Sequence, residues 1–579
     1  MTDSPGPWVN GLTIGEMLRR SAQKHSDCDA VVFPALNSGG SPFSSSDPLA
    51  TASAAETACY RLSYRQLDEE VDRVARGLIA IGIEKGQHVA LWATNWPQWV
   101  LLQYAAARIG AVLVNVNPAY RSTELAYVLK QSDVKALFLV DEFRSSNYFS
   151  LLAEAVPELS RSAPGQLNAA ESPQLRHVVS LKETCESGMW SWDAFLKQGD
   201  AIAENLLSSR QSELQPNNPI NVQYTSGTTG FPKGAMLTHR NLLLNAYYIG
   251  DCQRIGPDDR ICVPVPFYHC FGCVLGVLCA AVHGAAMIVP AEYFDAEATL
   301  TAIEAERATS IYGVPTMFIA QLEHPTFPDR DLSSLRTGIM AGSPCPIEVM
   351  NRVVNEMHAH EITIAYGLTE ASPVITQTRT DDPLQLRVQT VGRPIPDIEV
   401  KLVDPASGEE LGNNRQGELY TRGHGVMLGY YNLPDETAGA IDDDGWLHSG
   451  DLAVRMPNGY YRITGRIKDM ICRGGENIYP REIEEFFYTH PAIQDVAVLG
   501  VPDPKYIEEV AAWVKLKEGA TATEDEIREF CRDKLAHYKV PRYLRLVSDF
   551  PQTVTGKIQK FKIREIMIQE LGLEEAETA

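Results

Sequence analysis

Helical and strand-like patterns of apolar residues alternate through the first quarter of the chain. A capping-box pair, Ser63 and Gln66, predicts the start of a helix. Apolar residues then recur every three or four positions, as expected for one buried helical face. These residues are Leu67, Val71, Val74, Ala75 and Leu78.

The following segments continue this alternation. Strand-like runs at 88–93, 111–117 and 136–140 are separated by a helical run at 99–110 and by a second helix that begins at Ser122. Helices of this length between strands predict right-handed crossovers and mostly parallel sheets. The predicted fold class is therefore α/β, with a large N-terminal domain made of mixed α/β subdomains.

The most apolar run of the chain covers residues 273–290. His283 and several small residues interrupt this run, and it is shorter than the ~20 residues that a membrane-spanning helix needs. The pattern therefore predicts a buried helix followed by a strand, and no transmembrane segment.

Two changes of composition divide the chain. Residues 34–57 are rich in Ser, Gly, Ala and Pro, which predicts a surface loop, with order left open. A second change, near residues 465–480, predicts a domain boundary that leaves a C-terminal domain of roughly 110 residues. The predicted domains are residues 1–466 and a small α+β domain over residues 467–579.

The balance of charge excludes several classes of partner. The 579 residues include 74 acidic and 51 basic side chains, a formal net charge of −23. This argues against nucleic acid or an anionic membrane surface as the main partner. The first residues lack the pattern of a signal or transit peptide, so we expect a cytoplasmic protein. Eleven scattered cysteines suit free thiols in a reducing compartment and predict no cysteine-based metal site.

The stretch YTSGTTGFPKG, at residues 224–234, has the composition of a phosphate-binding loop. Its backbone N–H groups and hydroxyls can surround phosphate oxygens, with Lys233 as a mobile counter-charge. It is not a Walker A loop, because that pattern requires Gly-Lys-Ser/Thr after four residues. This difference weakens the assignment to a kinase or a GTPase.

Six further motifs follow this loop. They are PFYHCFG (266–272), AYGLTEASPV (365–374), GYYN (429–432), DGWLHSGDL (444–452), YYRITGRIKDMICRGGENIYPREIE (460–484) and PQTVTGKIQK (551–560). In content and order they resemble the motifs of the adenylate-forming superfamily, which includes acyl-CoA synthetases, firefly luciferases and the adenylation domains of peptide synthetases. The resemblance covers most of the chain and is greatest to the medium-chain and general fatty acyl-CoA synthetase branch.

The resemblance implies a site for ATP. Lys557 matches the catalytic lysine that bridges the carboxylate and the α-phosphate, and Glu370 matches the acid that holds Mg²⁺. Asp451, assisted by Arg466, would accept hydrogen bonds from the ribose, and Tyr366 would stack on adenine. The expected ATP-binding residues are Thr225, Ser226, Gly227, Thr228, Thr229, Gly230, Lys233, Gly342, Ser343, Tyr366, Gly367, Thr369, Asp451 and Arg466.

The resemblance also implies an acid-binding site beside the nucleotide. His269 would lie at the carboxylate of the acid, and Thr369 would touch the α-phosphate. The expected acyl-pocket residues are His269, Val274, Tyr312, Gly313, Val314 and Leu368. They include no obvious cation for a second carboxylate, which favours an unbranched or modestly substituted apolar acid.

A moving C-terminal domain is the third implication. Lys468 falls at the family's hinge, where a backbone rotation would withdraw Lys557 from the adenylate and open a tunnel for CoA. Some cations of the basic segment 534–568 would then meet CoA phosphates. The expected CoA-binding residues are Arg473, Gly474, Gly475 and Glu476.

The function predicted is that of an AMP-forming acyl-CoA synthetase for a fatty, medium-chain acid. Its partners would be the acid, ATP, CoA and Mg²⁺, with a homodimer left open. The alternatives are an aryl-acid CoA ligase and a catalytically silent nucleotide-binding regulator. A luciferase-like oxygenase is a weaker alternative, because residues 473–477, RGGEN, are of the CoA-dependent type.

Overall fold

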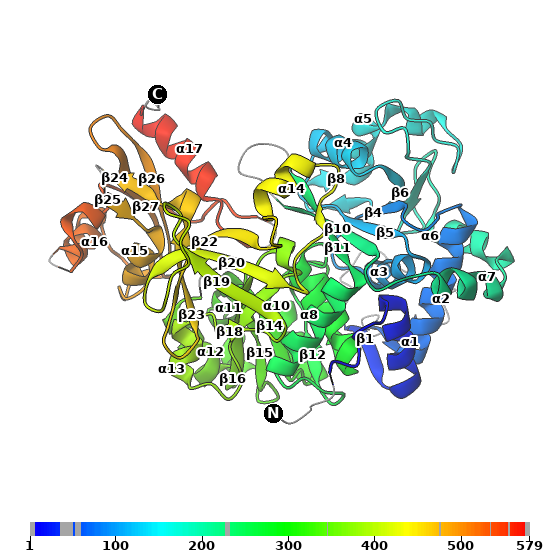
Figure 1. The fold of residues 1–579 in the computed structure, drawn as a ribbon, viewed down its shortest axis with the longest axis horizontal. Helices are drawn as coiled ribbons and strands as arrows, with labels where there is room; N and C mark the ends of the chain where they lie inside the picture. Colours follow the sequence, from blue (N-terminus) through cyan, green and yellow to red (C-terminus); the bar gives the residue numbers. More distant parts are fainter. Residues whose placement is uncertain are drawn as a thin grey trace.

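The structure is a computed structural model that describes residues 6–34, 50–51, 59–225, 232–343, 345–473, 476–532, 534–553 and 556–573. A large body carries the elements up to β23, and a smaller group of elements, orange to red in Figure 1, lies at one side of it. In the described part of the chain no helix is both long and apolar enough to cross a membrane.

A seven-stranded sheet forms the first half of the large body. Its parallel core runs from β10 to β9, and β11 and β21 extend it in antiparallel fashion. In spatial order the strands are β21 (Gly429–Tyr430), β11 (Lys233–Thr238), β10 (Pro219–Thr225), β5 (Val112–Asn115), β4 (His88–Trp92), β6 (Val134–Leu139) and β9 (His177–Ser180).

A ten-stranded sheet forms the second half. It is parallel from β16 to β1 and antiparallel at both edges. In spatial order the strands are β18 (Arg393–Pro394), β17 (Val374–Gln377), β16 (Glu361–Gly367), β15 (Thr337–Ala341), β14 (Ser310–Gly313), β12 (Arg260–Cys262), β13 (Ala286–Ile288), β1 (Asp29–Phe33), β3 (Cys59–Ser63) and β2 (Ala50–Thr51).

Helices cover and separate these sheets. The α-helices are α1 (Ile14–Lys24), α2 (Tyr64–Ala80), α3 (Pro97–Ile109), α4 (Ser122–Gln131), α5 (Tyr148–Ala155), α6 (Trp192–Gln198), α7 (Glu204–Ser212), α8 (His239–Cys252), α9 (Cys279–His283), α10 (Ala296–Glu306), α11 (Pro315–Leu322), α12 (Ile347–Glu356) and α13 (Leu384–Gln389). The shorter elements are η1 (Pro157–Arg161), η2 (Gly199–Ala201), η3 (Phe271–Leu278), η4 (Phe327–Asp329), η5 (Thr369–Ala371), β7 (Glu142–Phe143) and β8 (Ser146–Asn147).

A four-stranded antiparallel sheet completes the large body. Its strands, in spatial order, are β19 (Ile398–Val403), β20 (Gln416–Gly423), β22 (Leu447–Arg455) and β23 (Tyr461–Arg466), accompanied by α14 (Pro434–Ala440). The hydrophobic core of the large body extends from Val9 to Tyr461.

The C-terminal elements have their own hydrophobic cores, which begin at Ile471. The chain reaches them through the short helix η6 (Ile467–Asp469). The sheet comprises β25 (Glu476–Ile478), β24 (Ile471–Arg473), β27 (Ile507–Leu516), β26 (Ile493–Asp503) and β28 (Tyr543–Leu546). The helices are α15 (Pro480–Phe487), α16 (Glu524–Cys531), η7 (His537–Lys539) and α17 (Lys560–Leu571).

Most local predictions from the sequence are confirmed. Helix α2 begins at a complete capping box of Ser63 and Gln66, and the alternating strands and helices from residue 88 to residue 139 form as expected. The apolar run 273–290 is a buried helix followed by strand β13, but its first part is a π-helix. In the predicted loop 34–57, residues 50–51 instead pair with β3 as a short strand, and residues 35–49 and 52–57 lie outside the described residues.

Candidate active site

The site begins where parallel strands of both sheets end. Strand β10 ends at Thr225, β14 at Gly313, β15 at Ala341 and β16 at Gly367. Ligands of α/β proteins commonly bind in the crevice outside the carboxyl ends of parallel strands. Predicted site residues therefore converge from segments that are far apart in the sequence.

Glu370 is held between the two sheets. It lies on η5, only 9% exposed, and its Oε1 accepts hydrogen bonds from Thr225 Oγ1 at 3.0 Å and Tyr430 Oη at 2.9 Å. Strand β10 of one sheet supplies Thr225, and the turn after β16 of the other supplies Glu370. The carboxylate is oriented by these two hydroxyl donors.

The carboxylate of Glu370 has few acidic neighbours. Among the residues that the structure describes, no group of three or more His, Cys, Asp and Glu side chains could hold a metal ion. Mg²⁺ in nucleotide sites is commonly bound by one or two carboxylates together with substrate phosphates and water. A single buried carboxylate beside a phosphate-type loop fits that mode of binding.

Asp451 is the centre of a second polar cluster. It is 5% exposed; its Oδ2 accepts from Tyr366 Oη at 2.7 Å, and its Oδ1 lies 2.9 Å from Arg466 Nε. Asp451 and Arg466 are partners in the pairing of β22 with β23. Tyr366, near the end of β16, links this pair to the ten-stranded sheet.

Lys557 comes from the C-terminal domain to the same site. Two hydrogen bonds with Thr553 hold its backbone: Thr553 N donates to Lys557 O at 2.8 Å, and Lys557 N donates to Thr553 Oγ1 at 3.1 Å. A Cβ atom added to Gly342 would lie 3.6 Å from Lys557 Cε, so the lysine side chain passes over the loop after β15. Burial, and then the positive charge of Arg466, lower the pKa of the Lys557 amine below its usual value.

His269 lies just before the π-helix η3. Its Nδ1 accepts a hydrogen bond from Phe271 N at 3.1 Å, which puts the proton of the neutral ring on Nε2. Burial, and then the charge of Lys557, lower the pKa of His269 to about 3. The imidazole is therefore neutral at physiological pH, and the amine of Lys557 is close enough to influence it.

The predicted acyl-pocket residues differ in how deeply they are buried. Tyr312 is fully buried, with its ring centroid 6.0 Å from that of Phe271, and Val274 is fully buried in η3. Val314 packs beside Gly342, where an added Cβ would meet Val314 Cγ1 at 3.1 Å. Leu368 is only partly buried.

Several predicted residues are not part of this group. Arg473 forms a bidentate pair with Glu509, at 2.8 and 2.7 Å, inside the C-terminal sheet, and Glu476 is exposed on β25. Lys468 is exposed on η6. Three other predicted residues do lie at the strand ends where the site begins: Gly313 (buried) ends β14, Gly367 (exposed) ends β16, and Ser343 (partly buried) lies two residues after β15.

The phosphate-type loop is only partly described. Lys233 binds Glu436, and its amine lies 5.5 Å from the centroid of the Tyr430 ring. The remaining predicted loop residues, and two of the predicted CoA-binding residues, lie outside the described residues. They are Ser226, Gly227, Thr228, Thr229, Gly230, Gly474 and Gly475.

The basic segment 534–568 is engaged in ion pairs. Lys560 pairs with Glu484 at 2.6 Å, and Arg542 pairs with Asp503 at 2.9 Å. Lys539 pairs with Glu482, and Arg545 binds Glu570. In this arrangement these four cations are neutralised within the C-terminal domain.

Two features of the site were missed in the sequence. Tyr430 belongs to the GYYN motif, yet only the structure reveals its hydrogen bond to Glu370. Cys270 and Cys273 stand at C-x-x-C spacing, and Cys270 Sγ lies 3.7 Å from Thr369 Oγ1. Burial raises the pKa of Cys270 to about 11, so this thiol is not activated as redox-active C-x-x-C thiols are.

Comparison with known proteins identifies the family. Residues 18–431 match the family of AMP-binding enzymes, and residues 482–557 match the C-terminal domain of AMP-binding enzymes. The chain belongs to the AMP-binding enzyme family.

Among similar proteins, YngI of Bacillus subtilis (strain 168) is 50% identical over 97% of this chain and 98% of its own. The mitochondrial medium-chain acyl-CoA ligase ACSF2 of Danio rerio is 43% identical over 98% of this chain and 90% of its own. ATP-bound MatB from Rhodopseudomonas palustris has a similar structure, with a TM-score of 0.78 and 27% identity over 96% of this chain and 99% of its own.

Proposed function

We propose that this enzyme is an AMP-forming acyl-CoA synthetase that activates a medium-chain fatty acid. The observation that carries the proposal is the meeting of Lys557 with the Gly342 loop and His269, beside the clusters of Glu370 and Asp451. A lysine from the second domain and carboxylates from the first suit a reaction between a carboxylate and a nucleoside triphosphate.

In the first half-reaction an acid carboxylate oxygen attacks the α-phosphorus of ATP, and pyrophosphate leaves. Two anions must meet, so positive charge has to be placed between them. Lys557 would supply that charge, and neutral His269 would lie against the acid. Asp451 and Arg466 would hold the ribose, with Tyr366 and Gly367 beside adenine.

Mg²⁺ would be held by Glu370 together with the triphosphate. When bound, the ion neutralises charge on the phosphates and orients them. Glu370 is suited to this role because Thr225 and Tyr430 orient its carboxylate. Thr369, on the same turn, would contact the α-phosphate.

In the second half-reaction the CoA thiol attacks the acyl carbonyl, the bond to AMP breaks, and acyl-CoA and AMP leave. We propose that the C-terminal domain rotates near Lys468 between the two steps. Lys557 would then withdraw, and residues 473–476 would approach the acyl group. Arg473 would keep its place in the C-terminal sheet during this motion, because Glu509 anchors it there.

A medium-chain acid is supported by two observations. The acyl-pocket residues Val274, Tyr312 and Val314 are buried and carry no charge, which suits an apolar chain. The ACSF2 relatives, 39 to 43% identical, are named medium-chain acyl-CoA ligases.

The test measures release of pyrophosphate and formation of acyl-CoA with ATP, Mg²⁺ and CoA. The substrates are the linear acids from acetate to palmitate, together with benzoate and cinnamate, each measured separately. A maximum of kcat/KM among the mid-length alkanoates is expected. A maximum of kcat/KM with benzoate or cinnamate would show that the enzyme acts on aryl acids instead of fatty acids. Release of pyrophosphate without formation of acyl-CoA would contradict CoA as the acceptor.

A further inference from the structure

The π-helix η3 is the least ordinary element near the acid site. All eight of its residues are buried, and the N–H of Cys279 at its end reaches back five residues to Val274 O. π-helices are rare, mostly occur as single turns and are frequent at functional sites. This one follows directly after His269 and Cys270.

One side of η3 is fixed by close packing. A Cβ atom on Gly276 would lie 2.7 Å from Val263 Cγ1, and one on Gly272 would lie 2.3 Å from Pro266 O. These two glycines therefore allow the segment to approach the loop after β12. This contact sets the distance of η3 from the ten-stranded sheet.

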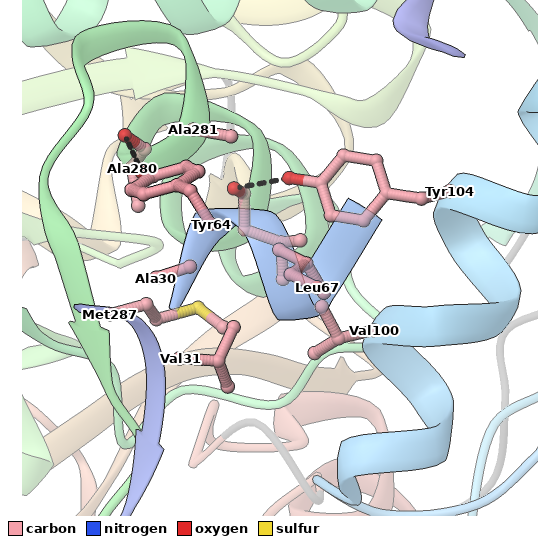
Figure 2. Close-up of a pocket in the computed structure, with 10 residues that line it drawn as sticks. Ala30, Val31, Tyr64, Leu67, Val100, Tyr104, Ala280, Ala281 and Met287 are labelled. Atoms are coloured by element: carbon pink, nitrogen blue, oxygen red, sulfur yellow. Dashed lines mark hydrogen bonds between the residues drawn. The ribbon is translucent and has the colours of Figure 1, made fainter. Parts of the chain in front are cut away.

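The other side of η3 is held by two consecutive side chains of α3. Gln103 Nε2 donates to Cys273 O at 3.0 Å, and Tyr104 Oη donates to Val277 O at 2.9 Å. Gln103 is 7% exposed and Tyr104 is 1% exposed. Figure 2 shows the Tyr104 ring extending from α3 to the backbone of this segment.

Side-chain donors from outside η3 matter because the backbone hydrogen-bond register changes between η3 and α9. An amide in η3 bonds five residues back, whereas α9 bonds four residues back, so the change from one to the other leaves a carbonyl without a helical N–H. Tyr64 Oη lies 2.7 Å from Ala285 O and 3.0 Å from Ala280 O, and Ala280 O also accepts from Ala285 N at 2.9 Å. Within η3 itself the amide of Gln103 and the hydroxyl of Tyr104 bind the carbonyls of Cys273 and Val277, and so favour the placement of the backbone that keeps these two contacts.

The position of η3 sets the surface that meets the acid. Cys270, just before η3, contacts Thr369, and Phe271 stacks on Tyr312. A cavity of about 10 Å³ adjoins Val277 (Figure 2), close to the smallest volume that holds a water molecule. The segment therefore has room for a small shift if its donors are removed.

We propose that Gln103 and Tyr104 are positioning residues that keep η3 in its π-helical register and so set which acyl chains the enzyme prefers. They act through the backbone of Cys273 and Val277 and touch no reacting atom. This inference rests on the proposed function, because the acid site is the one assigned there.

The test uses Tyr104→Phe, which removes one hydroxyl and keeps the ring. Relative kcat/KM values are measured over the linear acids from butyrate to palmitate and over benzoate and cinnamate. We expect the ratio between the preferred acid and its neighbours to change at least about threefold, with the KM for ATP unchanged. Gln103→Leu should change the ratios in the same way.

Hydrogen exchange of peptides from residues 271–278 is the second measurement. It should become about three- to tenfold faster in Tyr104→Phe. The control is Tyr148→Phe, which removes an equally buried hydroxyl bonded to Pro118 O at 2.6 Å. This control should lower the free energy of unfolding by a similar amount. It should leave unchanged both the relative kcat/KM values over the acids (the acyl profile) and hydrogen exchange in residues 271–278.

An acyl profile in Tyr104→Phe that matches that of Tyr148→Phe would overturn the inference, even if exchange in 271–278 increases. Unchanged exchange in 271–278 would also overturn it. If the wild-type enzyme activates none of the acids, the proposed function fails instead, and hydrogen exchange alone then decides whether Tyr104 holds η3.

Discussion

The amine of Lys557 lies in a site built mostly by the other domain. Removing it in Lys557→Ala should lower pyrophosphate release about 10²- to 10³-fold, the effect typical of one charge-stabilising group. Formation of acyl-CoA from supplied acyl adenylate should fall far less, because the adenylate already contains the bond that Lys557 is proposed to help form. The two half-reactions are measured separately, with single-turnover kinetics.

Lys515→Ala is the control for Lys557→Ala. Lys515 is a lysine of the same domain, paired with Asp549 at 3.5 Å, and its loss should leave both half-reactions unchanged. Equal loss of the two steps in Lys557→Ala would contradict the division of labour proposed for the domains.

Glu370→Gln tests the proposed magnesium ligand. The amide keeps an acceptor for Thr225 and Tyr430 but loses the negative charge that a hard cation requires. The Mg²⁺ concentration for half-maximal pyrophosphate release should rise by about tenfold, equivalent to about 1.4 kcal/mol. The control is Glu482→Gln, at a carboxylate that pairs with Lys539, and it should leave the Mg²⁺ concentration for half-maximal release unchanged. If Glu370→Gln also leaves that concentration unchanged, Glu370 is not a ligand of the metal.

At the scale of elements, strands β24 and β27 are tied by a buried ion pair. The pair joins Arg473 and Glu509, and Glu509 is only 1% exposed. In Arg473→Met the nearest remaining cation to Glu509 is Arg542, at 3.8 Å. Leaving a buried carboxylate without its close partner should destabilise the C-terminal domain by about 3 kcal/mol. Urea unfolding, with hydrogen exchange of β24 and β27, measures this loss.

The double variant Arg473→Met/Glu509→Met supplies the comparison. It removes the orphaned charge, so it should recover much of the stability that the single variant loses. A double variant no more stable than Arg473→Met would show that the ion pair is not the source of the effect.

The regular elements were predictable because their patterns are local. Helix α2 shows a helical apolar period after a capping box, and strands β4 and β6 are short apolar runs with clear boundaries. The π-helical register of η3 was not predictable, because it is apolar on every side and has no periodicity to measure. Strand β2 was missed because two residues that pair only with β3 leave no pattern.

The composition of the site was predictable only in part. Motifs located Glu370, Asp451 and Lys557, since each lies in a distinctive short sequence. Their contacts depend on segments separated by 60 to 145 residues, such as Tyr430 and Thr225 on Glu370, and no local pattern contains such pairs. The residues of α3 behind η3 were missed because helix α3 is buried on all sides and its polar members have no motif.

At the scale of the whole molecule, buried neutral histidines make stability dependent on pH. Burial is the main cause that lowers the pKa of His239 to about 3 and those of His177 and His424 to about 4, as for His269. Between pH 6.5 and these values the unfolded chain binds protons that the folded protein does not. Each histidine therefore costs about 1.4 kcal/mol of stability per pH unit in that window as the pH falls.

The expected result is a Tm that is level above pH 7 and falls steeply between pH 6.5 and pH 5. Burial raises the pKa values of Glu292, Glu485 and Asp495, and these carboxyls oppose part of the loss. Scanning calorimetry from pH 5 to pH 8 measures the balance, with His360→Gln, at an exposed position, as the control. A Tm that stays constant down to pH 5 would contradict the role of the buried histidines.

The chain crosses only once from the core that ends at Tyr461 to the cores that begin at Ile471. A domain attached in this way meets hydrodynamic friction whenever it turns. In the proposed mechanism complete turnover needs Lys557 to leave and return, so its rate should fall as glycerol or sucrose raises the solvent viscosity. Pyrophosphate release in a first turnover, started with the lysine already in place, should be almost insensitive to the same viscogens.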